Sequence, residues 1–239
     1  MVAEFSTIYI GGMAIDPAWL APTWFLDSDS DEVGDFARDA SDGASTPMDV
    51  AINLFHAVRD GYRYDPYSNS HQPEDYKAST VVHSDRNWCV PKSVLLTAAA
   101  RNRSIPARLG FADVRNHLTS PKLQATLGTD LFIWHGYSEI LLNDRWFRLS
   151  SAFNIELCEK FGVKVLEFDG TEDALMHPYD QSGNQHMEYV NYRGSFDDLP
   201  LDEMRADFVE FYPNWATSST PSSDGVSGAE AAGDDAFTL

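Results

Sequence analysis

Hydrophobic side chains recur at helical spacing through the first half of the chain and alternate with polar ones in several later segments. The segment 47–61 carries the clearest helical pattern. Thr46 can cap this helix, Pro47 suits its first turn, and Asp49 has the spacing of a capping box. The pattern therefore predicts a helix here, and it predicts a shorter acidic helix over about 29–40.

An apolar helix begins at Cys89 or Val90, because Pro91 is tolerated only in the first turn of a helix. Its body, up to Asn102, is rich in small and apolar residues and suits burial in a core.

Alternating segments in the second half of the chain predict strands. Residues 131–142 and 145–151 form a hairpin around the turn Asn143-Asp144. Helices that come early and a hairpin sheet that follows indicate an α+β fold. The remaining expected elements are strands over 5–15, 23–26, 107–115 and 187–192, and helices over 155–161 and 201–211.

The charge of the chain excludes several partners. The 239 residues include 37 acidic and 17 basic side chains, a formal net charge of −20. Sequence-independent binding of nucleic acid and of acidic membrane surfaces is disfavoured by this charge. No apolar run reaches the length of a membrane helix and no basic leader precedes one, so we expect a cytoplasmic protein. Residues 1–214 are expected to form a single domain, and 215–239 a disordered acidic tail rich in Ser, Gly and Ala.

Only two cysteines are present, Cys89 and Cys158. They are too few for a disulfide scaffold and lack metal-ligand spacing, so neither a metal nor another cofactor is expected. Cys89 stands at a helix start, where backbone N–H groups and the helix dipole favour the thiolate and could also hold an oxyanion. The alternative is a small buried core residue. Cys158 lies between glutamates and is interpreted as structural.

A thiol nucleophile needs a histidine, and His135 is the most distinctive of the seven. It lies in the middle of an apolar strand, beside Gly136, which leaves room for the imidazole; a core histidine is the alternative. If Asn143-Asp144 is a two-residue turn, the numbers of two facing residues in the hairpin sum to about 287, so Ala152 is expected opposite His135. Ser150 and Asn154 are then expected on the same face of the sheet as His135. Either side chain could accept a hydrogen bond from the ring.

The segments 87–96 and 100–108 resemble the cysteine block of the transglutaminase-like superfamily, in which an apolar helix ends in "R-x-x-G-I-P-A-R". Residues 135–142 with Arg145-Trp146 resemble its histidine block, and 59–64 its upstream element. The likeness is greatest to bacterial transglutaminase-like cysteine peptidases and extends over about 20–212. It implies a papain-like core, with a nucleophile helix packed on an antiparallel sheet.

The resemblance implies Cys89 as nucleophile and His135 as general base. The third member, usually Asp in "W-x-x-x-D-P-T", falls at Ser150, a weaker partner without charge. Asn154 is slightly preferred as the orienting residue, because its amide carbonyl is the better oriented acceptor. Three aromatic residues could contact substrate or only pack: Trp88, Tyr62 and Tyr64.

The leading hypothesis is thiol-dependent acyl chemistry on a peptide or small-molecule amide or acyl substrate. Hydrolysis, as by a cysteine peptidase or amidase, and acyl transfer to an amine stay open. The alternative is a non-catalytic binding or scaffold protein that keeps the fold with a degraded triad, because Ser replaces Asp at position 150. The sequence leaves the oligomeric state open.

Overall fold

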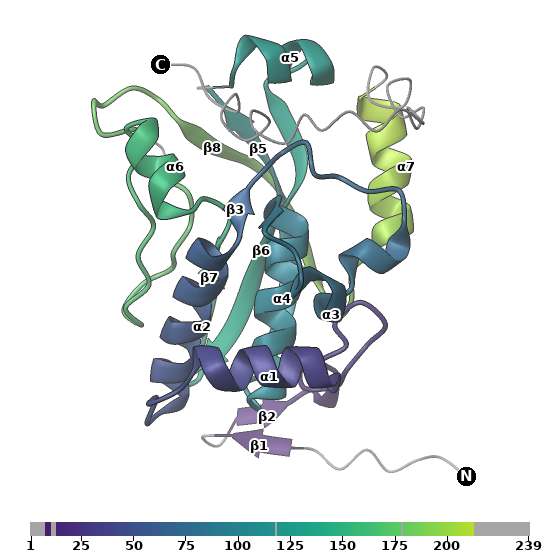
Figure 1. Cartoon of the computed structure of the whole chain (residues 1–239), viewed down its shortest axis with the longest axis vertical. Helices are drawn as coiled ribbons and strands as arrows, with labels where there is room; N and C mark the ends of the chain where they lie inside the picture. The colour runs from purple at the N-terminus through teal and green to yellow at the C-terminus, as the bar shows by residue number, and fades with distance from the viewer. Residues whose placement is uncertain (1–7, 11–12, 118, 178, 213–239) are drawn as a thin grey trace.

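A four-stranded antiparallel sheet forms the centre of the molecule (Figure 1). The computed structural model describes residues 8–10, 13–117, 119–177 and 179–212, so the expected tail over 215–239 lies outside the described residues. The strand order is β7-β6-β5-β8. The strands are β5 (Ala107–Asn116), β6 (Leu131–Leu142), β7 (Arg145–Leu149) and β8 (Met187–Phe196).

The helix α4 (Cys89–Asn102) packs on this sheet and is covered by three further helices. These are α1 (Asp31–Ala40), α2 (Pro47–Gly61) and α3 (Ala78–Val81). Every residue of α4 from Cys89 to Arg101 is buried, as expected for a helix rich in small and apolar residues. The fold is α+β, with a buried central helix on an antiparallel sheet, as the sequence predicts.

The start of α2 follows its sequence signature. Thr46 Oγ1 accepts a hydrogen bond from Asp49 N at 3.1 Å, and Asp49 Oδ2 accepts one from Thr46 N at 2.9 Å. This reciprocal pair is the predicted capping box. The closing helix α7 (Leu201–Phe211) also has the predicted bounds.

The β6–β7 hairpin has the predicted register over its paired length. Asn143 and Asp144 both adopt positive φ, of 51° and 63°, which suits a two-residue turn. Pairs run from Leu142↔Arg145 to Ser138↔Leu149, so each pair sums to 287.

Beyond Leu149 the prediction is wrong, because the strand ends there and the Ser150 amide donates to the carbonyl of Ala174 at 2.8 Å. Ala152 therefore does not pair with His135, which lies opposite Ala112 of β5.

The expected strand over 23–26 is wrong. Thr23 N donates to Leu26 O and Leu26 N donates to Thr23 Oγ1, so local bonds close a turn that competes with strand pairing. The remaining elements are short: β1 (Ile8–Ile10) and β2 (Met13–Ile15), which pair with each other, η1 (Pro17–Trp19), β3 (Arg63–Tyr64) beside β4 (Arg86–Asn87), η2 (Pro73–Tyr76), α5 (Pro121–Leu127) and α6 (Ile155–Lys160).

Within the described ranges, no helix combines the length and apolar character needed to cross a bilayer.

Candidate active site

The N-terminus of α4 lies directly against strand β6. A Cβ atom added at Gly136 would lie 3.2 Å from Val90 Cα and 3.3 Å from Val90 Cγ2. Glycine at this position thus permits the close approach of the first turn of α4 to the strand that carries His135. The space beside the imidazole that the sequence attributes to Gly136 is occupied by Val90.

Cys89 is the first residue of α4 and is 6% exposed. Burial raises the pKa of its thiol to about 11, while the backbone N–H groups of Gly136, Val90 and Cys89 itself oppose the rise. The sequence predicts a lowered pKa from the helix N-terminus. That contribution is present, but burial outweighs it, so the resting group is a neutral thiol.

His135 follows a break in the regular pairing of β5 and β6. The register shifts between Ala112 and Val114, and Trp134 adopts a φ of 60°. Asp113 Oδ1 accepts a hydrogen bond from Trp134 N at 3.1 Å, which helps to hold this irregular backbone. A bulge redirects the side chains that follow it, here His135.

The imidazole of His135 is buried, and burial lowers its pKa to about 4. Its Nε2 atom lies 3.3 Å from Ser150 Oγ, within hydrogen-bond distance. Nδ1 is then the ring nitrogen left to face another group. The side chain of Tyr189 packs edge-on against the ring, with the centroids 6.1 Å apart.

The preference for Asn154 as the partner of His135 finds no support in this geometry. Asn154 Oδ1 accepts a hydrogen bond from Tyr64 N at 3.0 Å, and Asn154 Nδ2 donates to Glu156 Oε2 at 2.5 Å. Because β7 ends before Asn154, this residue leaves the sheet and its amide joins β3 to α6. Ser150, the other candidate, is the one that reaches the ring.

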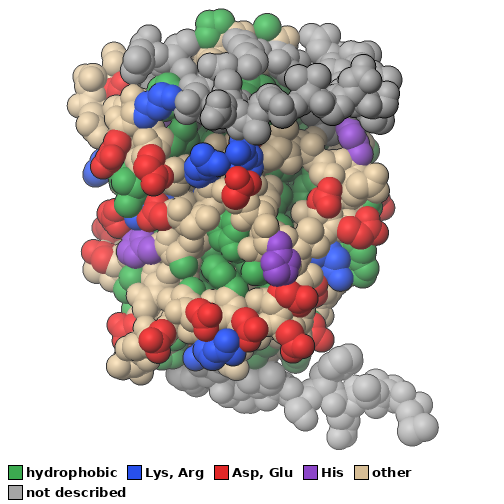
Figure 2. Space-filling model, viewed as in Figure 1, with side chains coloured by type: hydrophobic (Ala, Val, Ile, Leu, Met, Phe, Trp, Pro, Cys, Tyr) green, Lys and Arg blue, Asp and Glu red, His purple; other side chains and the backbone are tan. Residues whose placement is uncertain are grey.

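Tyr64 lies near the cysteine and Tyr62 faces another surface. Burial raises the pKa of Tyr64, and a Cys89 thiolate would raise it further. Burial raises the pKa of Tyr62 to about 12 with no contribution from Cys89; the Tyr62 hydroxyl donates to Val82 O at 3.3 Å. Tyr62 lines a cleft of about 700 Å³ between α1 and α2 that Phe36 also lines. Figure 2 shows this face of the molecule, with hydrophobic side chains at its centre and carboxylates along its lower edge.

Three further tyrosines interact electrostatically with Cys89 and were not predicted from the sequence. For Tyr76, Tyr189 and Tyr212, burial raises the pKa of the phenol, and a Cys89 thiolate raises it further. They come from η2, from β8 and from the residue after α7, segments far apart in the chain. No local sequence pattern could predict that these tyrosines lie near Cys89, because only the fold brings their segments together.

Trp88 immediately precedes the nucleophile candidate and lies between Tyr76 and Phe208, with ring centroids 6.3 Å and 6.2 Å away. It lines a polar pocket of about 220 Å³ that reaches Pro91 in the first turn of α4. Among the described residues, no acceptor lies within hydrogen-bond distance of its buried indole N–H. Trp88 is therefore a wall of a small pocket at the start of α4.

Cys158 is buried in α6, and burial raises the pKa of its thiol to about 11. In the part of the chain that the structure describes, no cluster of three or more His, Cys, Asp or Glu side chains could hold a metal ion.

Comparison with known proteins gives one family match and one similar structure. Residues 34–151 match the model of the transglutaminase-like superfamily. Among solved structures, the putative cysteine protease of Cytophaga hutchinsonii is similar, with 14% identity and a TM-score of 0.45. That match covers 76% of this chain and 55% of the other, so the chain spans little more than half the length of that protein. None of the curated proteins matches the chain.

The matched segment begins in α1 and ends just after β7, and it contains Cys89, His135 and Ser150. This match places residues 34–151 in the transglutaminase-like superfamily. Membership supports a general thiol-based catalytic role.

Proposed function

We propose that the protein catalyses acyl chemistry through a covalent intermediate on Cys89, with His135 as general base and Ser150 as its hydrogen-bond partner. The observation that carries the proposal is the contact between the start of α4 and β6. Val90, the residue after Cys89, packs on Gly136, the residue after His135, and the Gly136 amide acts on the Cys89 sulfur. A thiol and an imidazole held on adjacent rigid elements match the requirement for an activated nucleophile.

The resting pair is neutral, because the pKa of Cys89 is raised to about 11 and that of His135 is lowered to about 4. The proton therefore passes from sulfur to the imidazole as the sulfur–carbon bond forms and the carbonyl electron pair moves to oxygen. His135 then gives that proton to the leaving amine as the carbon–nitrogen bond breaks. Water or a second amine attacks the resulting thioester and releases the acyl group.

Backbone N–H groups supply the electrostatic support for this sequence. Those of Cys89, Val90 and Gly136 favour negative charge at the sulfur, and the first-turn amides of α4 also suit an oxyanion beside it. The pocket beside Trp88, of about 220 Å³, has room for one small side chain or for an incoming amine.

The test is to trap the acyl group on the protein. A p-nitrophenyl ester and an N-acylated glutamine peptide serve as acyl donors, each with and without a primary amine, and intact mass locates the adduct. We expect an acyl mass on the wild type and on Cys158→Ala, and none on Cys89→Ala. His135→Asn should form the adduct about 10²- to 10⁴-fold more slowly.

The same experiment separates hydrolysis from transfer, since only transfer yields an acylated amine. An acyl group that remains on Cys89→Ala would contradict the proposal. The absence of any adduct on the wild type would favour the non-catalytic binding protein, for which the uncharged Ser150 is the motivating observation.

A further inference from the structure

A buried lysine lies three residues after Cys89, one turn along α4. Lys92 is 0% exposed, although α4 is otherwise an apolar helix over this turn. Its Nζ donates to Arg59 O at 2.9 Å, to Tyr62 O at 2.6 Å and to Ala152 O at 2.8 Å. An ammonium group has three N–H donors and a neutral amine has two, so only the charged form satisfies all three carbonyls.

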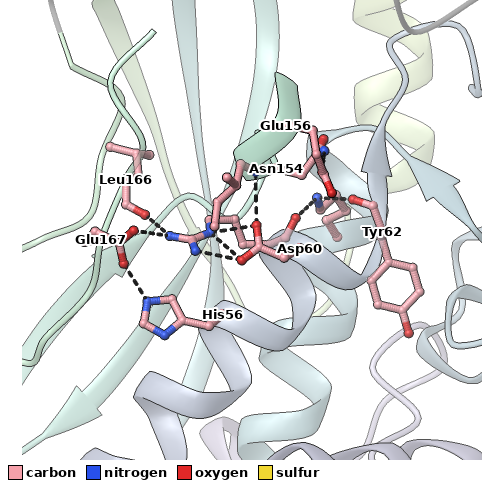
Figure 3. A network of polar contacts seen from close by, with 10 residues as sticks. His56, Asp60, Tyr62, Asn154, Glu156, Leu166 and Glu167 are labelled. Carbon is pink, nitrogen blue, oxygen red and sulfur yellow. Dashed lines mark hydrogen bonds and ion pairs between the residues drawn. The ribbon is translucent and has the colours of Figure 1, made fainter. Parts of the chain in front are cut away.

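Two of these carbonyls belong to the end of α2, where the helix dipole favours a positive charge. The third, Ala152, belongs to the segment between β7 and α6, which also contains Ser150 and Asn154. Figure 3 shows the end of α2 at Tyr62 close to Asn154 of that segment and to Glu156 in the first turn of α6. Lys92 thus joins the nucleophile helix to two other parts of the fold.

The segment 150–155 is fastened at both ends. Ser150 N donates to Ala174 O at 2.8 Å, and Ile155 N donates to Asp60 Oδ1 at 3.1 Å. Between these points Lys92 holds Ala152, two residues from the hydroxyl that contacts His135. A shift of Ala152 away from α4 would carry Ser150 with it.

The charge of Lys92 also acts on the cysteine. In its protonated form Lys92 lowers the pKa of Cys89, against the larger effect of burial, and burial also lowers the pKa of Lys92 itself, to about 7. The groups that face Lys92 are Asp60 and Arg59 on α2, Cys158 on α6 and Cys89 on its own helix.

We propose that Lys92 is a positioning residue of the active site: it holds the Ser150 segment against the nucleophile helix and, in its protonated form, supplies a positive charge that favours the Cys89 thiolate. The inference rests on the proposed function for the reaction that the site performs. Its test uses the ionisation of Cys89, which can be measured without any turnover.

Arg101 provides a matched control at the other end of the same helix. It is 3% exposed and donates to three main-chain carbonyls, those of Ala107 at 2.9 Å, Ala21 at 2.7 Å and Asp197 at 2.9 Å. Lys92→Met and Arg101→Met each remove a buried cation that bonds three carbonyls. Both should lower the melting temperature, and only the first should affect the cysteine.

The measurement is the rate of alkylation of Cys89 by iodoacetamide as a function of pH, followed by the mass of the Cys89 peptide. Because the pKa of Lys92 is lowered to about 7, its charge acts on Cys89 at pH 6, and there we expect Lys92→Met to be alkylated about tenfold more slowly than the wild type. Lys92→Arg, which keeps the charge, should stay near the wild type at pH 6, and Arg101→Met should leave that rate unchanged. In the acylation assay, Lys92→Met should lower kcat with little change in KM.

An unchanged alkylation rate at pH 6 in folded Lys92→Met, or an equal loss in Arg101→Met, overturns the inference. If Lys92→Met does not fold, Lys92→Gln and Lys92→Arg decide the matter, since glutamine keeps two donors without the charge and should lower the rate at pH 6. Activity that persists in Cys89→Ala would instead contradict the proposed function, and the alkylation result for Lys92 would still stand.

Discussion

The substitution Gly136→Ala acts on the contact that brings the two catalytic candidates together. The new Cβ would lie 3.2 Å from Val90 Cα, 3.3 Å from Val90 Cγ2 and 3.4 Å from Phe111 Cε1. Ordinary van der Waals contact begins at 3.4 Å. Because Val90 Cα is a backbone atom, no rotamer change relieves the contact, and α4 or β6 must move by a few tenths of an ångström.

The size of the effect follows from this movement. An extra methyl group in a closely packed core costs about 1–3 kcal/mol of unfolding free energy. A displacement of 1 Å at a catalytic group can cost about 100-fold in rate, so a few tenths of an ångström should lower kcat about three- to tenfold. The backbone φ of Gly136 is not among the positive values found in the described residues, so the cost is steric rather than conformational.

The assay compares Gly136→Ala with two other glycine substitutions, by thermal unfolding and by the rate of acylation. Gly34→Ala in α1 meets only Asn102 Nδ2 at 3.5 Å and should leave the rate unchanged. Gly110→Ala would overlap the ring of Tyr137, so it should be the least stable of the three without touching Cys89. If Gly136→Ala acylates at the wild-type rate, the packing of α4 on β6 does not set the geometry of the site.

Three other predictions concern ionisation, the third member of the site and the scaffold. The alkylation midpoint of Cys89 should lie near pH 11 rather than 9.0, which leaves about 100-fold less thiolate at neutral pH; a midpoint at or below 9.0 would contradict the role of burial. Ser150→Ala should lower kcat severalfold at an unchanged melting temperature. Asn154→Ala should instead lower the melting temperature, because the Tyr64 amide loses its acceptor. If Asn154→Ala lowers kcat and Ser150→Ala does not, Asn154 is the orienting residue. Thr46→Ala removes the helix cap of α2 and should lower the free energy of unfolding, measured with denaturant, by about 0.5–2 kcal/mol. The acylation rate should not change, and a change in it would link α2 to catalysis.

Local signals account for the parts of the fold that the sequence predicts. The capping box of α2, the proline in the first turn of α4 and the Asn143-Asp144 turn each act over four residues or fewer, so they are readable without the fold. The turn also sets the pairing register of the hairpin as far as Leu149.

The failures have tertiary causes. The end of β7 depends on Ala174, which accepts the hydrogen bond from the Ser150 amide, and no pattern within the hairpin contains that information. The ionisation of Cys89 depends on how deeply the fold buries it, and the helix-terminus argument includes only the opposing contribution. Lys92 carries a visible signal, a charge inside an apolar helix, but its three acceptors come from α2 and from the segment after β7.

The burial of Cys89 has a consequence for its survival in the absence of substrate. Oxidants and electrophiles react with thiolates, and the first oxidation product, a sulfenic acid, forms in proportion to the thiolate present. A thiol with a pKa of about 11 is almost entirely protonated at neutral pH, so it reacts slowly with these reagents. Under the proposed mechanism, the cysteine is thereby protected while idle, and it would become nucleophilic only when a carbonyl group beside it can receive the electron pair as His135 takes the proton.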